Sequence, residues 1–60
     1  MKKFEIYMNN EDNALTVLGE IITVADTGQS VIYSKNDPTY ANIVAIIPKS
    51  AVVIVSPITN

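Results

Sequence analysis

Twelve residues in the first half of the chain decide its fold: residues 15–26 read LTVLGEIITVAD. Aliphatic side chains occupy both parities of this stretch, with Leu18, Ile22 and Val24 on one and Val17 and Ile21 on the other. A strand that is apolar on both faces bends strongly, is buried on both sides or contacts a partner. Gly19 stands where a bend fits, because glycine tolerates unusual backbone angles and close approach. We therefore predict one long, bent strand over residues 15–25.

The composition of the whole chain favours the same class of fold. Val, Ile and Thr make up 21 of the 60 residues, whereas there are only two Leu. Side chains branched at Cβ lose rotamer freedom in a helix and pack well on a pleated sheet. The chain has 48% hydrophobic and 17% charged residues, which is too apolar for a disordered protein. The sequence therefore predicts a single all-β domain over residues 1–60.

Further strands are predicted on both sides of this stretch. Phe4, Ile6 and Met8 alternate with polar or aromatic residues, which predicts a strand over residues 3–8. The polar cluster at residues 9–13 predicts a loop, with a short helix after Asn10 or Asp12 as the alternative. Turns at residues 26–29, with Gly28, and at residues 36–39 separate strands at residues 29–35 and 41–47. A break at residues 48–50, read as one turn of 3₁₀ helix, precedes a strand at residues 51–56.

Five short strands with this spacing predict a small, strongly bent antiparallel barrel of the SH3-like or Sm-like kind. Residues 15–26 are similar to the first Sm-like signature, in which a glycine, alternating aliphatics and a turn aspartate follow one another. Residues 42–55 resemble the second signature, two aliphatic strands around a minimal polar turn. The resemblance implies a barrel. In that family RNA is read by residues at both turns, and here only Asp26 and Lys49 stand at comparable places.

The residue types needed for catalysis are scarce. The chain has no His and no Cys, so general base catalysis would fall on six scattered carboxylates. Glu11 and Asp12 are neighbours in a polar loop, which is typical of solvated side chains, and the loop lacks the glycine and distal glutamate of a calcium site. We predict no enzyme activity, no cofactor and no metal site. A net charge of −2 without arginine also disfavours nucleic acid, although three tyrosines could stack on bases.

The strongest functional indication is surplus apolar surface. Ile43, Ile47, Val53 and Val55 share one parity, and Val44, Ile46, Val52 and Ile54 the other. A small barrel hides one such set, and the second set must face a partner. The predicted oligomer interface comprises Ile43, Val44, Ile46, Val53, Ile54 and Val55. The residues predicted to contact a partner or ligand are Tyr33, Asp37, Tyr40 and Lys49, with Tyr40 the most exposed tyrosine.

Three functions follow from these expectations. The first is a homo-oligomeric, non-catalytic protein that binds another protein, as an adaptor, an inhibitor or an accessory protein of a phage or mobile element. The second is an Sm-like RNA or nucleotide binder centred on Asp26, Tyr33 and Lys49, and the third is a structural component of a larger assembly. The longest apolar region, residues 43–55, is interrupted by Pro48 and is too short to span a membrane. We therefore expect a cytoplasmic protein.

Overall fold

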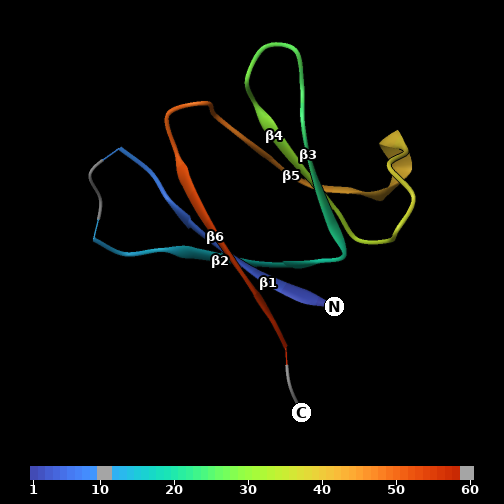
Figure 1. Cartoon of the computed structure of the whole chain (residues 1–60), viewed down its shortest axis with the longest axis horizontal. Helices are drawn as coiled ribbons and strands as arrows, with labels where there is room; N and C mark the ends of the chain where they lie inside the picture. Colours follow the sequence, from blue (N-terminus) through green and yellow to red (C-terminus); the bar gives the residue numbers. More distant parts are fainter. Residues whose placement is uncertain (10–11, 59–60) are drawn as a thin grey trace.

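The computed structural model describes residues 1–9 and 12–58 and shows an all-β fold (Figure 1). Six strands form two antiparallel sheets of three strands each. Sheet A has the order β2-β1-β6, and sheet B has the order β3-β4-β5. The strands are β1 (Lys2–Tyr7), β2 (Leu15–Gly19), β3 (Ile21–Val24), β4 (Ser30–Tyr33), β5 (Ile43–Ile47) and β6 (Val52–Pro57), and one 3₁₀ turn, η1, spans Tyr40–Asn42.

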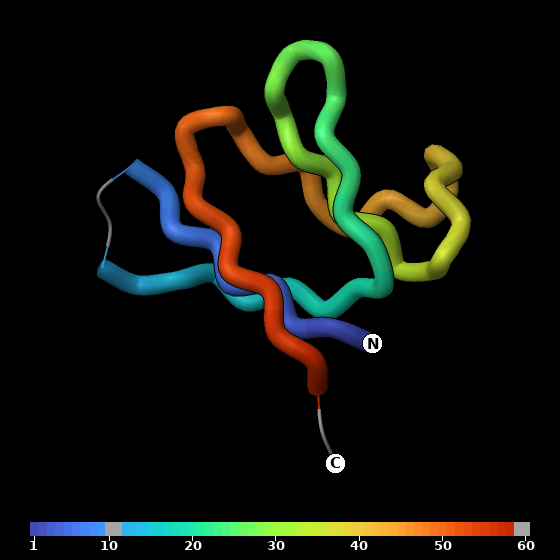
Figure 2. The backbone as a smooth tube through the Cα atoms, viewed as in Figure 1, coloured from blue at the N-terminus to red at the C-terminus, as the bar shows by residue number. Residues whose placement is uncertain are grey.

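The predicted long strand is present and bends where expected. β2 and β3 are one chain segment that turns a corner at Gly19 and Glu20, so it contributes one half to each sheet (Figure 2). A Cβ atom on Gly19 would lie 2.7 Å from Ile32 Cγ2 and 2.9 Å from the carbonyl oxygen of Tyr33. That oxygen accepts a hydrogen bond from the Glu20 N–H at 2.8 Å. Glycine is required here because the corner of sheet A presses against the backbone of sheet B.

The core lies where the two sheets meet. Phe4 and Ile6 of β1, Ile32 of β4 and Ile47 of β5 are its buried hydrophobic residues among those described. In β1, the buried Phe4 and Ile6 alternate with exposed or half-buried residues, which confirms the period of two expected for this strand. Partly buried side chains surround this cluster: Met8, Val17, Ile22, Ala45, Ala51 and Val53. One small cluster therefore holds the two sheets together.

The turn between β3 and β4 also matches its prediction. Gly28 has a φ of +91°, in the left-handed region that glycine enters without steric cost. The Gly28 N–H donates to the Ala25 carbonyl at 2.9 Å, and the Ala25 N–H donates to the Gln29 carbonyl at 2.8 Å. These bonds close the hairpin.

Three expectations need correction. The sheets do not close into a five-stranded barrel, because the bend divides the long strand and because β5 and β6 diverge from the turn that joins them without pairing in either sheet (Figure 2). The 3₁₀ turn expected at residues 48–50 lies instead at Tyr40–Asn42, so β5 begins at Ile43. Residues 48–51 form an ordinary turn, in which the Pro48 carbonyl accepts a hydrogen bond from the Ala51 N–H at 3.1 Å. The alternative helix after Asn10 or Asp12 does not form at residues 12–14, and residues 10 and 11 lie outside the described part.

Candidate protein-binding surfaces

The outer face of sheet A mixes aliphatic side chains with one ion pair. Lys3, Glu5 and Tyr7 alternate with the core residues of β1, so they point away from sheet B. The strand register places five side chains beside them on this face: Leu18 and Thr16 of β2, and Ser56, Ile54 and Val52 of β6. Lys3 Nζ lies 3.9 Å from Glu5 Oε1, and both side chains are partly exposed. The ion pair is thus bordered by apolar groups on the neighbouring strands.

The described strand residues on the outer face of sheet B are all uncharged. Its side chains alternate with core-facing residues along the three strands: Ile21, Thr23, Val31, Tyr33, Val44 and Ile46. Val31 lies between Thr23 and Ile46 in one cross-strand row. Ile46 is 60% exposed and Val44 is 45% exposed. A sheet face of six uncharged side chains is a typical protein-binding surface.

A well-defined loop projects from the end of sheet B. Residues 34–42 join β4 to β5, and Asn42 fastens them: its side-chain amide donates to the Asp37 carbonyl at 3.0 Å and to Thr39 Oγ1 at 3.2 Å. The Ser34 N–H closes the base of the loop by donating to the Asn42 carbonyl at 2.8 Å. Tyr40 lies on this loop with 92% of its surface exposed, which confirms its predicted exposure. These hydrogen bonds hold the backbone on both sides of the exposed Tyr40 side chain.

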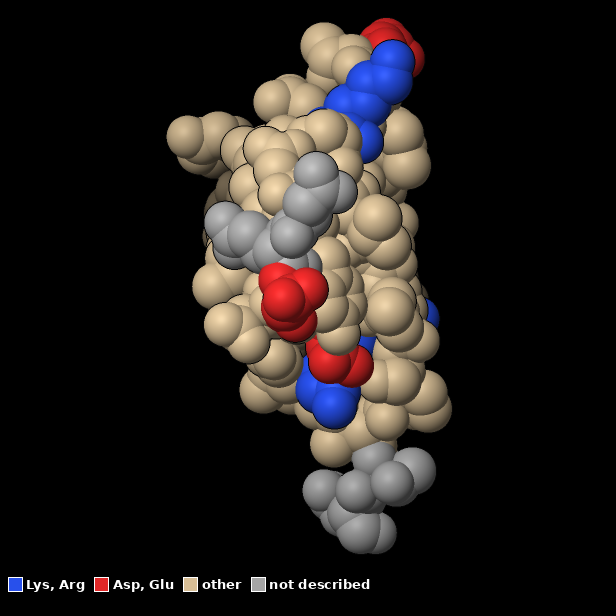
Figure 3. Space-filling view, turned by 90° about the vertical axis from the view of Figure 1, so that its left-hand side faces the viewer, with Lys and Arg blue, Asp and Glu red and all other residues tan. Residues whose placement is uncertain are grey.

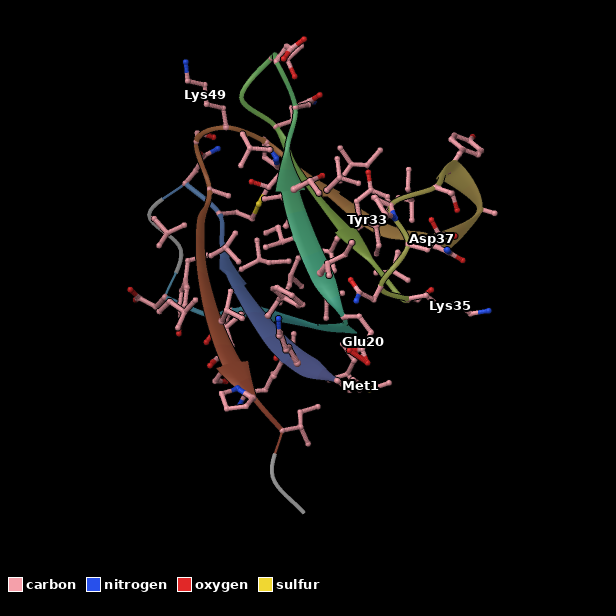
Figure 4. The ribbon with its side chains drawn as sticks, turned by 45° about the vertical axis from the view of Figure 1, so that its right-hand side comes forward. Met1, Glu20, Tyr33, Lys35, Asp37 and Lys49 are labelled. Carbon is pink, nitrogen blue, oxygen red and sulfur yellow. The ribbon has the colours of Figure 1, made fainter. Side chains whose placement is uncertain are left out.

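The other two predicted turns lie side by side at the opposite end of sheet B. The aliphatic stem of Lys49 crosses Gly28, because a Cβ atom on Gly28 would lie 2.8 Å from Lys49 Cδ. Asp26 belongs to the same turn as Gly28. Tyr33 lies at the far end of β4, opposite Ile21 rather than opposite the turn. Figure 4 shows Lys49 well separated from Tyr33 and Asp37.

The predicted partner-contact residues therefore divide into two groups. Tyr33, Asp37 and Tyr40 belong to the strand end and loop at one end of sheet B, and Lys49 belongs to the turn at the other. The three tyrosines do not come from one surface, since Tyr7 lies on sheet A.

The predicted interface residues also divide. Val44, Ile46, Ile54 and Val55 are exposed, whereas Val53 packs against the core and Ile43 is half-buried. Val55 shares the parity of the core residues but is 46% exposed, because it lies on the outermost strand of sheet A.

Several exposed aliphatic residues were not among the predicted site residues. Val52 is 60% exposed, and its parity with Ile54 could have revealed it. Leu15, Leu18 and Val24 are 62%, 50% and 72% exposed. The exposure of Leu18 could not be read from parity, because the corner at Glu20 changes which parity faces the core. Leu15 and Val24 have the core-facing parity of their strands but are exposed at the first residue of β2 and the last residue of β3.

Charged groups are few and separated on the surface. Figure 3 shows small groups of charged side chains on a largely uncharged side of the molecule. The α-amino group of Met1 lies 3.2 Å from Glu20 Oε1, and these residues adjoin in Figure 4. Within residues 1–9 and 12–58 there is no pocket and no group of three metal-ligating side chains. The same residues include no helix with the length and apolar character needed to cross a bilayer.

Comparisons with known protein families, with curated proteins and with solved structures give no match.

Proposed function

We infer that this chain is a small, non-catalytic β protein that associates with itself and acts by binding another protein, as an adaptor or inhibitor. One observation carries this proposal: among the described residues, four hydrophobic side chains are buried and eleven large ones are exposed. The exposed set comprises Met1, Leu15, Leu18, Val24, Tyr40, Val44, Ile46, Val52, Ile54, Val55 and Ile58.

The surface area supports the same inference. The chain exposes 4330 Å², whereas a compact monomer of this mass exposes about 3,800 Å². Fully burying one aliphatic side chain contributes about 1.5–3 kcal/mol. A partner that covers three or four of the exposed aliphatics would thus stabilise a fold with a small core of its own.

The distribution of polar groups supports a binding role rather than catalysis. The sequence has no His and no Cys, so carboxylates are the only side chains that could act as bases near neutral pH. Glu5 and Glu20 each lie within ion-pair distance of an amino group. Asp26 and Asp37 belong to turns at different ends of sheet B. These carboxylates do not converge on one site.

The RNA-binding alternative has less support. It depends on Asp26, Tyr33 and Lys49 acting together, and Tyr33 lies at the other end of β4 from the turn that contains Asp26. The net charge of −2 gives little electrostatic attraction to phosphate.

Affinity capture with a matched control tests the proposal. The wild-type chain and a Val44→Lys/Ile46→Lys variant serve as bait in nuclease-treated lysate of the native host, and bound proteins are identified by mass spectrometry. Both substituted side chains are exposed, so the variant should keep the circular dichroism of a folded β protein. We expect a protein that the wild type retains and the variant loses. Equal retention by both baits, together with a wild type that sediments as one subunit, would refute the proposal.

A further inference from the structure

The outer edge of β6 is an open strand edge with little protection. One side of β6 pairs with β1, and no described strand pairs with the other. Natural proteins blunt such edges with charges, prolines or bulges. β5 has a register irregularity opposite Ile32 and Tyr33, and Pro48 follows it directly. β6 instead runs without a bulge or a charge from Val52 to Ser56 before Pro57 ends it.

The alternation of hydrogen-bonded and non-hydrogen-bonded residue pairs between β1 and β6 shows which backbone groups of β6 face the open edge. The Ile58 N–H donates to the Met1 carbonyl at 3.4 Å, and bonded pairs alternate along an antiparallel ladder. Ile54, opposite Glu5, therefore uses its backbone groups toward β1. Val53 and Val55 direct their N–H and C=O groups away from β1, toward the open edge. At the two ends of this edge no donor is free, since Pro57 has no N–H and the Ala51 N–H bonds to the Pro48 carbonyl at 3.1 Å.

We propose that the partner at this edge is β6 of a second copy, paired antiparallel about a two-fold axis beside Ile54. In this register Val53 faces Val55 of the second copy, and the reciprocal pair follows by symmetry, so all four outward N–H groups find acceptors. A shift that centres Val55 places Val53 opposite Pro57, and a shift that centres Val53 places Val55 opposite Ala51. The first shift leaves the Val53 carbonyl without a donor, because Pro57 has no N–H, and the second leaves the Val55 carbonyl without one, because the Ala51 N–H already bonds to the Pro48 carbonyl. The register centred on Ile54 pairs every outward N–H and carbonyl of Val53 and Val55.

Burial and charge fit the same register. The side chains that gain cover are those left open on β6: Val52 at 60%, Ile54 at 48% and Val55 at 46% exposed. The two Ile54 side chains meet on the outer face, and each lies beside Glu5 of its own chain. The two Glu5 residues are three strand spacings apart, roughly 14 Å, which exceeds the Debye length of about 8 Å at physiological salt. The pairing would extend sheet A into one continuous six-stranded sheet. This inference rests on the proposed self-association.

Single-cysteine cross-linking tests it, because the natural chain contains no Cys. Ile54 would form the non-hydrogen-bonded pair, where Cα atoms lie about 4.5 Å apart, within the range of a disulfide. We expect Ile54→Cys to form a covalent dimer under mild oxidation at least about tenfold faster than two controls. Val55→Cys lies on the same strand with 46% exposure but would face Val53, and Ile46→Cys is more exposed, at 60%.

The outcomes separate the pairing from self-association itself. Selective cross-linking of Ile54→Cys supports the two-fold register. Cross-linking rates that follow exposure, with Ile46→Cys fastest, overturn it while leaving the proposed function intact if the wild type still sediments as an oligomer. A wild type that sediments as a single folded subunit overturns both. Should Ile54→Cys fold poorly, the double variant Val52→Cys/Ser56→Cys tests the same register, because Val52 would face Ser56 of the second copy and neither side chain belongs to the core.

Discussion

The corner at Gly19 gives the sharpest test of the fold. In Gly19→Ala the new methyl group would lie 2.7 Å from Ile32 Cγ2, where carbon atoms normally approach to about 3.5–4.0 Å. Ile32 is completely buried, so it has little room to yield. The methyl group would also lie 2.9 Å from the Tyr33 carbonyl oxygen, which the Glu20 N–H holds at 2.8 Å. Relief of this contact requires a shift of backbone at the junction of both sheets.

The expected cost follows from these contacts. Overpacking of a core costs about 1–3 kcal/mol, and weakening one hydrogen bond adds about 0.5–1.5 kcal/mol. The lower chain entropy of alanine in the unfolded state offsets about 0.4–1 kcal/mol. We expect a net loss of about 2 kcal/mol, which lowers the melting temperature by roughly 8–16 °C in a domain of this size.

Thermal and urea unfolding followed by far-ultraviolet circular dichroism measure this loss. Both proteins must be compared at one concentration, because self-association makes the melting temperature concentration-dependent. Ile32→Leu removes the Cγ2 methyl group, so a double-mutant cycle should show that Gly19→Ala costs at least about 0.5 kcal/mol less in that background. A Gly19→Ala variant as stable as the wild type would refute the close approach at the corner.

Three further substitutions follow from the same structure. Val53→Asp should unfold the chain, because it places a charge against the core. Ile54→Asp should still fold, with a free energy of unfolding lower by about 1 kcal/mol because the new carboxylate faces Glu5, and it should sediment as a smaller species than the wild type. Similar behaviour of the two variants would contradict the assignment of the faces. Gly28→Val should lower stability by about 1–2 kcal/mol in chemical denaturation, because its φ of +91° is strained for a branched residue, and Gly28→Asn should cost less; the reverse order would argue against the turn geometry. Asn42→Ala should cost about 1 kcal/mol and raise amide hydrogen exchange at residues 34–42, and unchanged exchange would show that its side chain does not fasten the loop.

Local pattern was sufficient to predict most of the strands. Alternation of Phe4 and Ile6 fixed the inner face of β1, and Gly28 marked the hairpin turn. The sequence also divides the aliphatic residues of 43–55 into two parities, and the structure exposes the set that comprises Val44, Ile46, Val52 and Ile54. These features depend on neighbours within a few residues, and such information is contained in the sequence.

Features that depend on distant contacts could not be predicted. The corner changes the inward parity: Val17 packs inward before it and Ile22 after it, an odd number of residues apart. The exposure of Val55 depends on whether β5 and β6 pair, which no local pattern reveals. The 3₁₀ turn at Tyr40–Asn42 is a local feature that was missed for another reason: the Asn42 side-chain bonds to Asp37 and Thr39 produce no periodic pattern of apolar residues.

Sedimentation equilibrium of the wild-type chain over a micromolar concentration range tests the central claim most directly. The excess of exposed over buried hydrophobic side chains predicts a mass of at least two subunits, with dissociation only on dilution. A mass of one subunit at every concentration, with the circular dichroism of a folded β protein, would contradict the claim that this surface requires a partner.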